Sequence, residues 1–178
     1  MKNSVSKFKK IALCGFMGAG KTSVFSSLSE GQKFAHYSFV DSDLTILESH
    51  SHESISAIVE EHGWKKFREI EKKVIEEAVK SNEMIVLSLG GGSLGSETLD
   101  LLAGSEVTLV WLKVDFRELL NRALLSRANR PLLKERSEKE LFNLYQEREK
   151  FYSEADIIIE NKSLDNTVTF LEKFLIGK

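Results

Sequence analysis

The chain has 178 residues and a formal net charge of −2, which argues against a general binder of nucleic acids or anionic membranes. Apolar residues make up 42% of it and charged residues 29%, which is typical of one globular domain and not of a disordered chain. A single cysteine, Cys14, excludes an internal disulfide framework and a cysteine-based zinc site, and it favours a reducing, cytoplasmic compartment.

Predicted strands and helices alternate along the chain. Lysines before the first apolar stretch resemble the start of a signal peptide, but glycines interrupt that stretch and no cleavage site follows. We therefore expect neither a signal peptide nor a membrane span. Strands are expected at 11–15, 34–40, 84–89, 107–114 and 155–160, and helices at 21–28, 55–61, 64–80, 116–125, 137–152 and 167–175. This order predicts an α/β domain with a parallel sheet, in which ligands bind beyond the carboxyl ends of the strands.

A glycine-rich loop, Gly15-Phe16-Met17-Gly18-Ala19-Gly20-Lys21-Thr22, follows the first predicted strand and precedes a helix. It fits G-x-x-x-x-G-K-[ST] in the context that the phosphate-binding motif requires, which a plain glycine-rich turn would not explain. Glycines let backbone N–H groups turn toward phosphate oxygens, and the helix N-terminus adds a favourable dipole. Lys21 would contact the β- and γ-phosphates, and Thr22 would hold Mg²⁺ through its hydroxyl. The predicted ATP-binding residues are Gly18, Ala19, Gly20, Lys21, Thr22 and Ser23.

Two aspartates close the second predicted strand with one residue between them. Asp41 and Asp43 would point to the same side if the strand geometry persisted, where they could serve Mg²⁺ and a substrate hydroxyl. The alternative is helix capping, for which Asp is a favoured residue. The phosphate-binding loop favours the functional interpretation.

Further candidates lie on the long helix and after the third strand. Arg68 and Glu71 are three residues apart and share a helix face, although most such pairs are solvated salt bridges of small value. Gly90-Gly91-Gly92 would allow a ligand to approach the backbone closely, unless they form only a flexible turn. His50 and His52 form a His-x-His pattern among serines and Glu53, and we interpret it as a solvated loop because no third metal ligand is apparent.

Six segments of the chain follow one another in this order: Gly15–Thr22, Asp41-Ser42-Asp43, Phe67-Arg68-Glu69-Ile70-Glu71, Gly90-Gly91-Gly92, Arg130-Pro131-Leu132-Leu133, and Arg148 with Tyr152. Each segment after the first is weak alone, and their combination is specific. The only proline of the chain, Pro131, lies in one of them, within a basic stretch between two predicted helices. In this order and at this approximate spacing, the six segments resemble those of shikimate kinases over about residues 9–160.

The resemblance implies a P-loop nucleoside-monophosphate-kinase-like, three-layer α/β fold with a five-stranded parallel sheet between helices. It implies one kinase domain over 1–178, with a substrate-binding subdomain at about 41–80 and a mobile lid at about 123–136. The implied reaction transfers the γ-phosphoryl group of ATP to the 3-hydroxyl of shikimate with the help of Mg²⁺. We expect a cytoplasmic monomer whose partners are shikimate and ATP, without nucleic acid or membrane.

The same resemblance implies a role for each matching residue. Asp43 would bind the ring hydroxyls and act as the base, and Asp41 would serve Mg²⁺ through water. Arg68 and Arg148 would bind the shikimate carboxylate, with Glu71 orienting Arg68 and Gly91 offering its backbone to the substrate. Arg130 would reach the phosphates from the lid. The arginine beside adenine could be Arg122 or Arg127, and the loop at 161–164 would edge the adenine.

The chain departs from the family pattern near the substrate subdomain. Trp64 follows Gly63 where Glu is common, and the usual glycine is missing at 50–53. The alternatives are another small-molecule kinase of this fold, such as a gluconate kinase, an adenylate-kinase-like enzyme, or a nucleotide-binding protein without turnover. Arg68, Gly91 and Arg148 fit a compact cyclic acid better than gluconate, and acidic residues at 41 and 43 would repel a second nucleotide.

Overall fold

The computed structural model describes residues 10–50, 52, 54–125 and 136–177. Five parallel strands form one sheet in the order β2-β3-β1-β4-β5, which confirms the predicted sheet. Ala12 of the central strand lies beside Leu87 on one side and Leu109 on the other. The strands are Lys10–Cys14 (β1), Ser38–Asp41 (β2), Ile85–Ser88 (β3), Val107–Lys113 (β4) and Ile157–Glu160 (β5).

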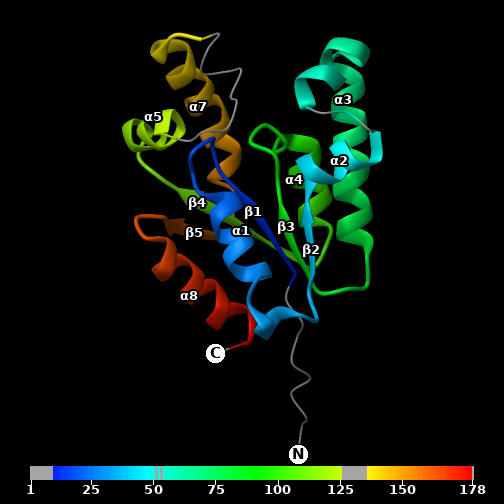
Figure 1. Cartoon of the computed structure of the whole chain (residues 1–178), viewed down its shortest axis with the longest axis vertical. Helices are drawn as coiled ribbons and strands as arrows, with labels where there is room; N and C mark the ends of the chain where they lie inside the picture. The colour runs from blue at the N-terminus through cyan, green and yellow to red at the C-terminus, as the bar shows by residue number, and fades with distance from the viewer. Residues whose placement is uncertain (1–9, 51, 53, 126–135, 178) are drawn as a thin grey trace, which may run out of the picture.

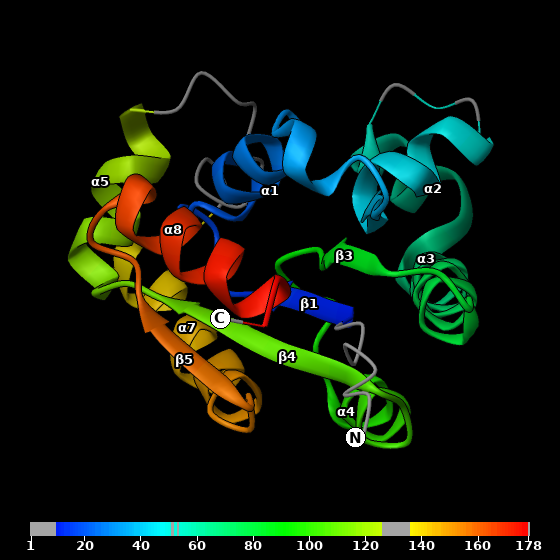
Figure 2. The same cartoon turned by 90° about the horizontal axis from the view of Figure 1, so that it is seen from below.

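Helices cover both faces of this sheet, because its inner strands are apolar on both sides. Figure 2 shows α1 and α8 on one face and α4 and α7 on the other. In the described part of the chain, no helix has the length and apolar character that crossing a membrane requires. The helices are Lys21–Ser29 (α1), Ser42–His50 (α2), Ile55–Lys80 (α3), Ser96–Ala103 (α4), Phe116–Leu125 (α5), Glu138–Tyr152 (α7) and Leu164–Leu175 (α8), with a short 3₁₀ helix at Gln32–Phe34.

Several local predictions need correction. The strand predicted at 34–40 begins only at Ser38, since the 3₁₀ helix and a turn precede it. The helices α2 and α4 were not predicted, because nine and eight residues show too little of the helical period. The break predicted between the helices at 55–61 and 64–80 is confirmed: Gly63, with φ of 77° and ψ of 161°, interrupts the helical backbone between the two parts of α3.

Two apolar clusters hold these elements together. The larger one surrounds β1, β3 and β4 and includes Ile11, Val86 and Val110. A smaller, separate cluster joins α2 to α3 through the buried side chains Ile46, Ile58, Phe67 and Ile70. In Figure 1, α2 and α3 rise on one side of the carboxyl ends of the strands and α5 and α7 on the other. The loops after β1 and β3 lie between these two groups of helices, where the candidate residues meet.

Candidate active site

The phosphate-binding loop has the backbone that its sequence predicts. Gly18 and Gly20 adopt φ angles of 81° and 90°, which disfavour any residue with a side chain. A Cβ atom at Gly18 would also lie 2.5 Å from the carbonyl oxygen of Leu119. The Lys21 Nζ donates to the carbonyl oxygen of Gly15 at 2.6 Å, so the lysine lies across the loop at the N-terminus of α1. The loop therefore presents a cation and a helix dipole where phosphates bind in this motif.

A buried asparagine holds this loop against the end of β5. Asn161 Nδ2 donates to the carbonyl oxygen of Ala19 at 2.7 Å, while Thr167 donates to Asn161 Oδ1 at 2.8 Å. Arg122 Nη1 donates to the carbonyl oxygen of Asn161 at 3.1 Å. Of the two arginines considered for the adenine side, Arg122 thus lies next to the loop after β5. Arg127 lies outside the described residues.

The two aspartates do not continue a strand, contrary to the alternation expected for them. β2 ends at Asp41, and α2 begins at Ser42. Asp41 Oδ1 accepts hydrogen bonds from the backbone N–H groups of Asp43 at 3.1 Å and Leu44 at 3.2 Å, which is the capping geometry considered as the alternative. Capping fixes the Asp41 carboxylate at the carboxyl end of β2, and Asp43 follows in the first turn of α2.

Asp43 lies in a partly desolvated and acidic environment. Burial, the neighbouring Asp41 and then Glu71 raise the pKa of Asp43 to about 6, against smaller opposing effects of Lys21 and Arg68. A Cβ atom at Gly90 would lie 2.5 Å from Asp43 Oδ1, so the carboxylate rests against the glycine loop after β3. The Gly90 N–H donates to the buried Ser42 hydroxyl at 2.9 Å, which ties this loop to α2.

Arg68 is held by a buried carboxylate. Arg68 Nη1 pairs with Glu71 Oε2, and the Ser93 hydroxyl donates to the other Glu71 oxygen at 2.6 Å. The Glu71 side chain is only 4% exposed, whereas that of Arg68 is 40% exposed, so the pair is more than a solvated surface bridge. The Arg68 guanidinium also lies 5.5 Å from the ring centre of Trp64, which is itself exposed.

Arg148, on α7, lies close to Arg68 at the glycine loop after β3. Its guanidinium lies 5.4 Å from the ring centre of Phe16 in the phosphate-binding loop. Burial lowers the pKa of Arg148, and the nearby Arg68 acts in the same direction, although a guanidinium stays charged at neutral pH. On the same helix, the Tyr152 hydroxyl donates to the carbonyl oxygen of Gly91 at 2.8 Å and so anchors the glycine loop.

The three glycines after β3 are the point where these groups converge. A Cβ atom at Gly92 would lie 2.8 Å from Arg68 Nη2 and 2.9 Å from Arg148 Nη2. A Cβ atom at Gly91 would lie 3.9 Å from the backbone nitrogen of Met17 in the phosphate-binding loop. Two guanidinium groups lie beside one glycine, and only that of Arg68 pairs with the buried Glu71. The pair of arginines therefore leaves positive charge that a small anion would neutralise. Asp43 lies against the neighbouring Gly90, and Lys21 is close enough to Asp43 to act against the rise of its pKa.

The side chains of Thr22 and Asp41 offer oxygen atoms that suit a magnesium ion. Thr22 is exposed in the first turn of α1, and Asp41 is half-buried at the end of β2. A hydroxyl and a carboxylate are the oxygen donors that Mg²⁺ prefers. The side chains thus fit the ion that a phosphate-binding loop of this type uses.

Some residues that build this site were missed from the sequence, and one residue predicted to be catalytic is not described. Ser42 and Ser93 carry no sequence signal of their own, because their partners lie on other elements. Tyr152 belongs to the segment that resembles shikimate kinases, but its bond to Gly91 depends on the packing of α7. Arg130, predicted to reach the phosphates from the lid, lies outside the described residues.

Known proteins match this chain over most of its length. The family model described as shikimate kinase matches residues 17–176. A shikimate kinase of Parabacteroides distasonis is 35% identical over 160 residues, which cover 88% of this chain and 90% of that protein. A solved shikimate kinase of Acinetobacter baumannii, in complex with shikimate, is 29% identical with a TM-score of 0.82 and covers 97% of this chain and 95% of its own.

A second solved structure, the shikimate kinase of Bacteroides thetaiotaomicron, is 27% identical with a TM-score of 0.78. It covers 94% of this chain and 98% of its own. The family match, the relatives and the fold agree with the placement of Asp43 and the two arginines at the glycine loop after β3. The chain belongs to the shikimate kinase family.

Proposed function

We propose that this chain transfers the γ-phosphoryl group of ATP to the 3-hydroxyl of shikimate, giving shikimate 3-phosphate and ADP on the route to chorismate and the aromatic amino acids. The observation that carries the proposal is that the guanidinium groups of Arg68 and Arg148 both lie against Gly92. Asp43 and the phosphate-binding loop lie next to them. Shikimate is a compact cyclic acid that bears both a carboxylate and hydroxyls. Such a substrate fits two guanidinium groups next to an aspartate.

The nucleotide would bind at the loop between β1 and α1. The backbone N–H groups of Gly18, Ala19 and Gly20 and the side chains of Lys21, Thr22 and Ser23 would contact its phosphates. Thr22 and Asp41, the latter through water, would hold Mg²⁺, which neutralises charge on the β- and γ-phosphates when bound. Arg130 would add a further positive charge from the lid.

The acid would bind through its carboxylate. Arg68 and Arg148 would each donate charge-assisted hydrogen bonds to it, and their planar guanidinium groups suit two-bonded recognition of a carboxylate. The buried pair with Glu71 keeps Arg68 in position for this contact. Gly91 would face the ring with its backbone, because it lies between Arg148 and the phosphate-binding loop, at 3.7 Å from Arg148 Nη1 and 3.9 Å from the backbone nitrogen of Met17 when measured from an added Cβ.

Asp43 would act on the reacting hydroxyl. With a pKa of about 6, its carboxyl is ionised at neutral pH and can accept the proton of the 3-hydroxyl. The hydroxyl oxygen then bonds to the γ-phosphorus as the bond to the β-phosphate oxygen breaks. ADP leaves, and Lys21 offsets the charge that develops on the transferred group.

Two parts of the single domain would serve the substrate and the nucleotide. We assign the substrate-binding subdomain to about 41–80, supported by the separate apolar cluster between α2 and α3. The lid is assigned to about 123–136, of which residues 126–135 lie outside the described part. We also propose a cytoplasmic monomer that engages neither nucleic acid nor membrane.

The test is release of ADP by the purified protein with Mg²⁺ and ATP, in the presence of different acceptors. The proposal predicts ADP release that depends on shikimate, and neither gluconate nor AMP should replace it. Activity with gluconate alone would keep the phosphate-loop assignment and refute the carboxylate pocket. Tight ATP binding without ADP release with any acceptor would indicate a nucleotide-binding protein without turnover.

A further inference from the structure

Three of the four histidines of the chain lie together, away from the phosphate-binding loop. His50 ends α2, His52 lies in the connection to α3, and His62 lies in α3 just before the kink at Gly63. The sequence alone predicts a solvated loop for His50 and His52, because no third metal ligand is apparent beside them. The fold supplies two more ligand groups from α3, Glu61 and His62.

One carboxylate lies between two imidazole rings in this cluster. His52 Nε2 is 2.8 Å from Glu61 Oε2, and His62 Nε2 is 3.4 Å from Glu61 Oε1. One ligand atom from each of the three side chains lies within 4.8 Å of the other two. A tetrahedral zinc ion with bonds of about 2.0–2.2 Å separates its ligand atoms by roughly 3.3–3.5 Å. Small side-chain movements would therefore bring the three groups around one ion.

The second nitrogen of His52 is fixed in the way that metal-binding histidines require. His52 Nδ1 lies 2.6 Å from the carbonyl oxygen of His50, to which it donates its N–H. This bond orients the ring and directs Nε2 toward Glu61. Metal-ligating histidines almost always donate their other ring N–H to a carbonyl or carboxylate oxygen. A neutral His52 would face Glu61 with a lone pair, so this nitrogen needs either a proton or a metal ion.

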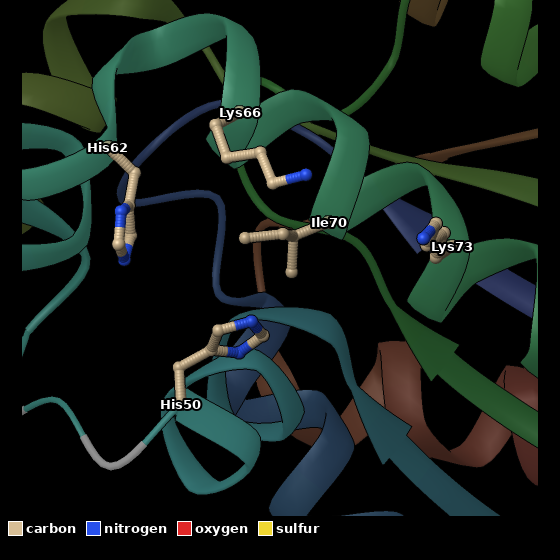
Figure 3. A pocket seen from close by; sticks show the side chains of 5 residues that line it. All are labelled: His50, His62, Lys66, Ile70 and Lys73. Carbon is tan, nitrogen blue, oxygen red and sulfur yellow. The ribbon is translucent and has the colours of Figure 1, made fainter.

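The cluster is open to solvent, since the Glu61 side chain is 60% exposed and that of His62 is 37% exposed. His62 also lines a pocket of about 260 Å³, together with His50, Lys66, Ile70 and Lys73. Figure 3 shows His50 of α2 across this pocket from the side chains of α3. Lys66 pairs with Glu69 at 3.2 Å, which offsets its charge near the cluster. The open side leaves room for water as a fourth ligand.

We propose that His52, Glu61 and His62 bind a divalent transition-metal ion of the zinc class, with water completing the coordination. Two imidazoles and a carboxylate favour Zn²⁺, Ni²⁺ or Cu²⁺ over Mg²⁺, which prefers oxygen ligands and keeps its own waters. The site is thus separate in chemistry and position from the magnesium site of the nucleotide. A bound ion links the connection between α2 and α3 to the part of α3 that precedes Gly63, Trp64 and Arg68.

The experiment is calorimetric titration of Zn²⁺ into metal-free, tag-free protein without nucleotide. We expect one ion per chain, and millimolar Mg²⁺ should not compete. His52→Asn, His62→Asn and Glu61→Gln should each weaken binding by about tenfold or more, since each removes one of three ligands. His36→Asn is the matched control, because this exposed histidine lies outside the cluster and its replacement should leave the affinity unchanged.

A second measurement does not depend on the variants folding. In an NMR spectrum of histidine-labelled wild-type protein, Zn²⁺ should shift the ring signals of His52 and His62 and leave those of His36 in place. Absence of Zn²⁺ binding, full binding by the variants of the cluster, or a shift confined to other histidines would each overturn the proposal.

Discussion

Gly92→Ala probes whether the two arginines bind the acid substrate. The new Cβ would lie 2.8 Å and 2.9 Å from Nη2 atoms of Arg68 and Arg148, closer than real Cβ contacts come. Gly92 is not among the glycines with positive φ, so alanine fits its backbone. Both obstructing atoms are the ends of flexible side chains. We therefore expect the fold to survive while both guanidinium groups move by several tenths of an ångström.

We expect the Gly92→Ala substitution to weaken the binding of shikimate and to leave the binding of ATP nearly unchanged. A hydrogen bond to a charged group contributes about 1.5–3 kcal/mol, so the loss of one such bond to the substrate raises KM for shikimate by roughly 10- to 150-fold. The KM for ATP should change by less than about twofold, because Gly92 contacts the arginines and not Lys21.

Steady-state ADP release at varied shikimate and varied ATP measures both constants. Gly95→Ala is the matched control three residues further on, since a Cβ atom there meets nothing within 4 Å. Gly95 is the N-cap of α4, so this control can lose up to about 1 kcal/mol of stability, but its KM values should match the wild type. An unchanged KM for shikimate in folded Gly92→Ala protein would refute the role of the two arginines.

Three further substitutions test the neighbouring groups. Lys21→Ala should lower kcat by about 100-fold or more, measured as ADP release, because it removes the cation at the phosphates; near-normal turnover in folded protein would contradict the phosphate chemistry. Arg148→Ala should mainly raise KM for shikimate, by about tenfold or more, and an unchanged KM would remove Arg148 from the pocket. Burial, Asp41 and Glu71 raise the pKa of Asp43 from 3.8 to about 6, so this carboxyl stabilises the fold below about pH 4 and loses that contribution as the pH rises through 6. Asp43→Asn should therefore raise the unfolding free energy of metal-free protein by roughly 1–3 kcal/mol at pH 8 and change it little at pH 4. Equal changes at both pH values would contradict the raised pKa.

The strands and the phosphate-binding loop could be predicted because their signals are local. The loop at 15–22 carries its glycines, lysine and threonine in one continuous motif, and positive φ at Gly18 and Gly20 follows from that motif. Apolar runs identified the inner strands, since both faces of these strands are buried.

The start of α2 shows where local reasoning failed. Asp41 and Asp43 would share one side of a continuing strand, but Asp41 caps a helix that begins at the next residue. The nine residues of α2 contain too few apolar positions to mark a helix, and its stability comes from packing of Ile46 against α3. The capping preference of Asp was the signal that pointed to this helix.

The glycine loop shows what only tertiary structure can supply. Three glycines at 90–92 predicted close approach of some group, but not which one. The approaching groups come from α2, α3 and α7, namely Asp43, Arg68 and Arg148. The buried Ser93 that completes the Glu71 pair has no sequence signature, because a serine gains this role only from its position.

The most direct test of the proposed reaction is identification of its product by ³¹P NMR correlated to protons. Wild-type protein, Mg²⁺, ATP and shikimate should together yield ADP and one phosphate ester whose phosphorus couples to the proton on carbon 3 of the ring. Phosphate on another ring hydroxyl would contradict the assigned position of Asp43. Inorganic phosphate as the only new product, or no new signal at all, would contradict the proposed transfer to shikimate.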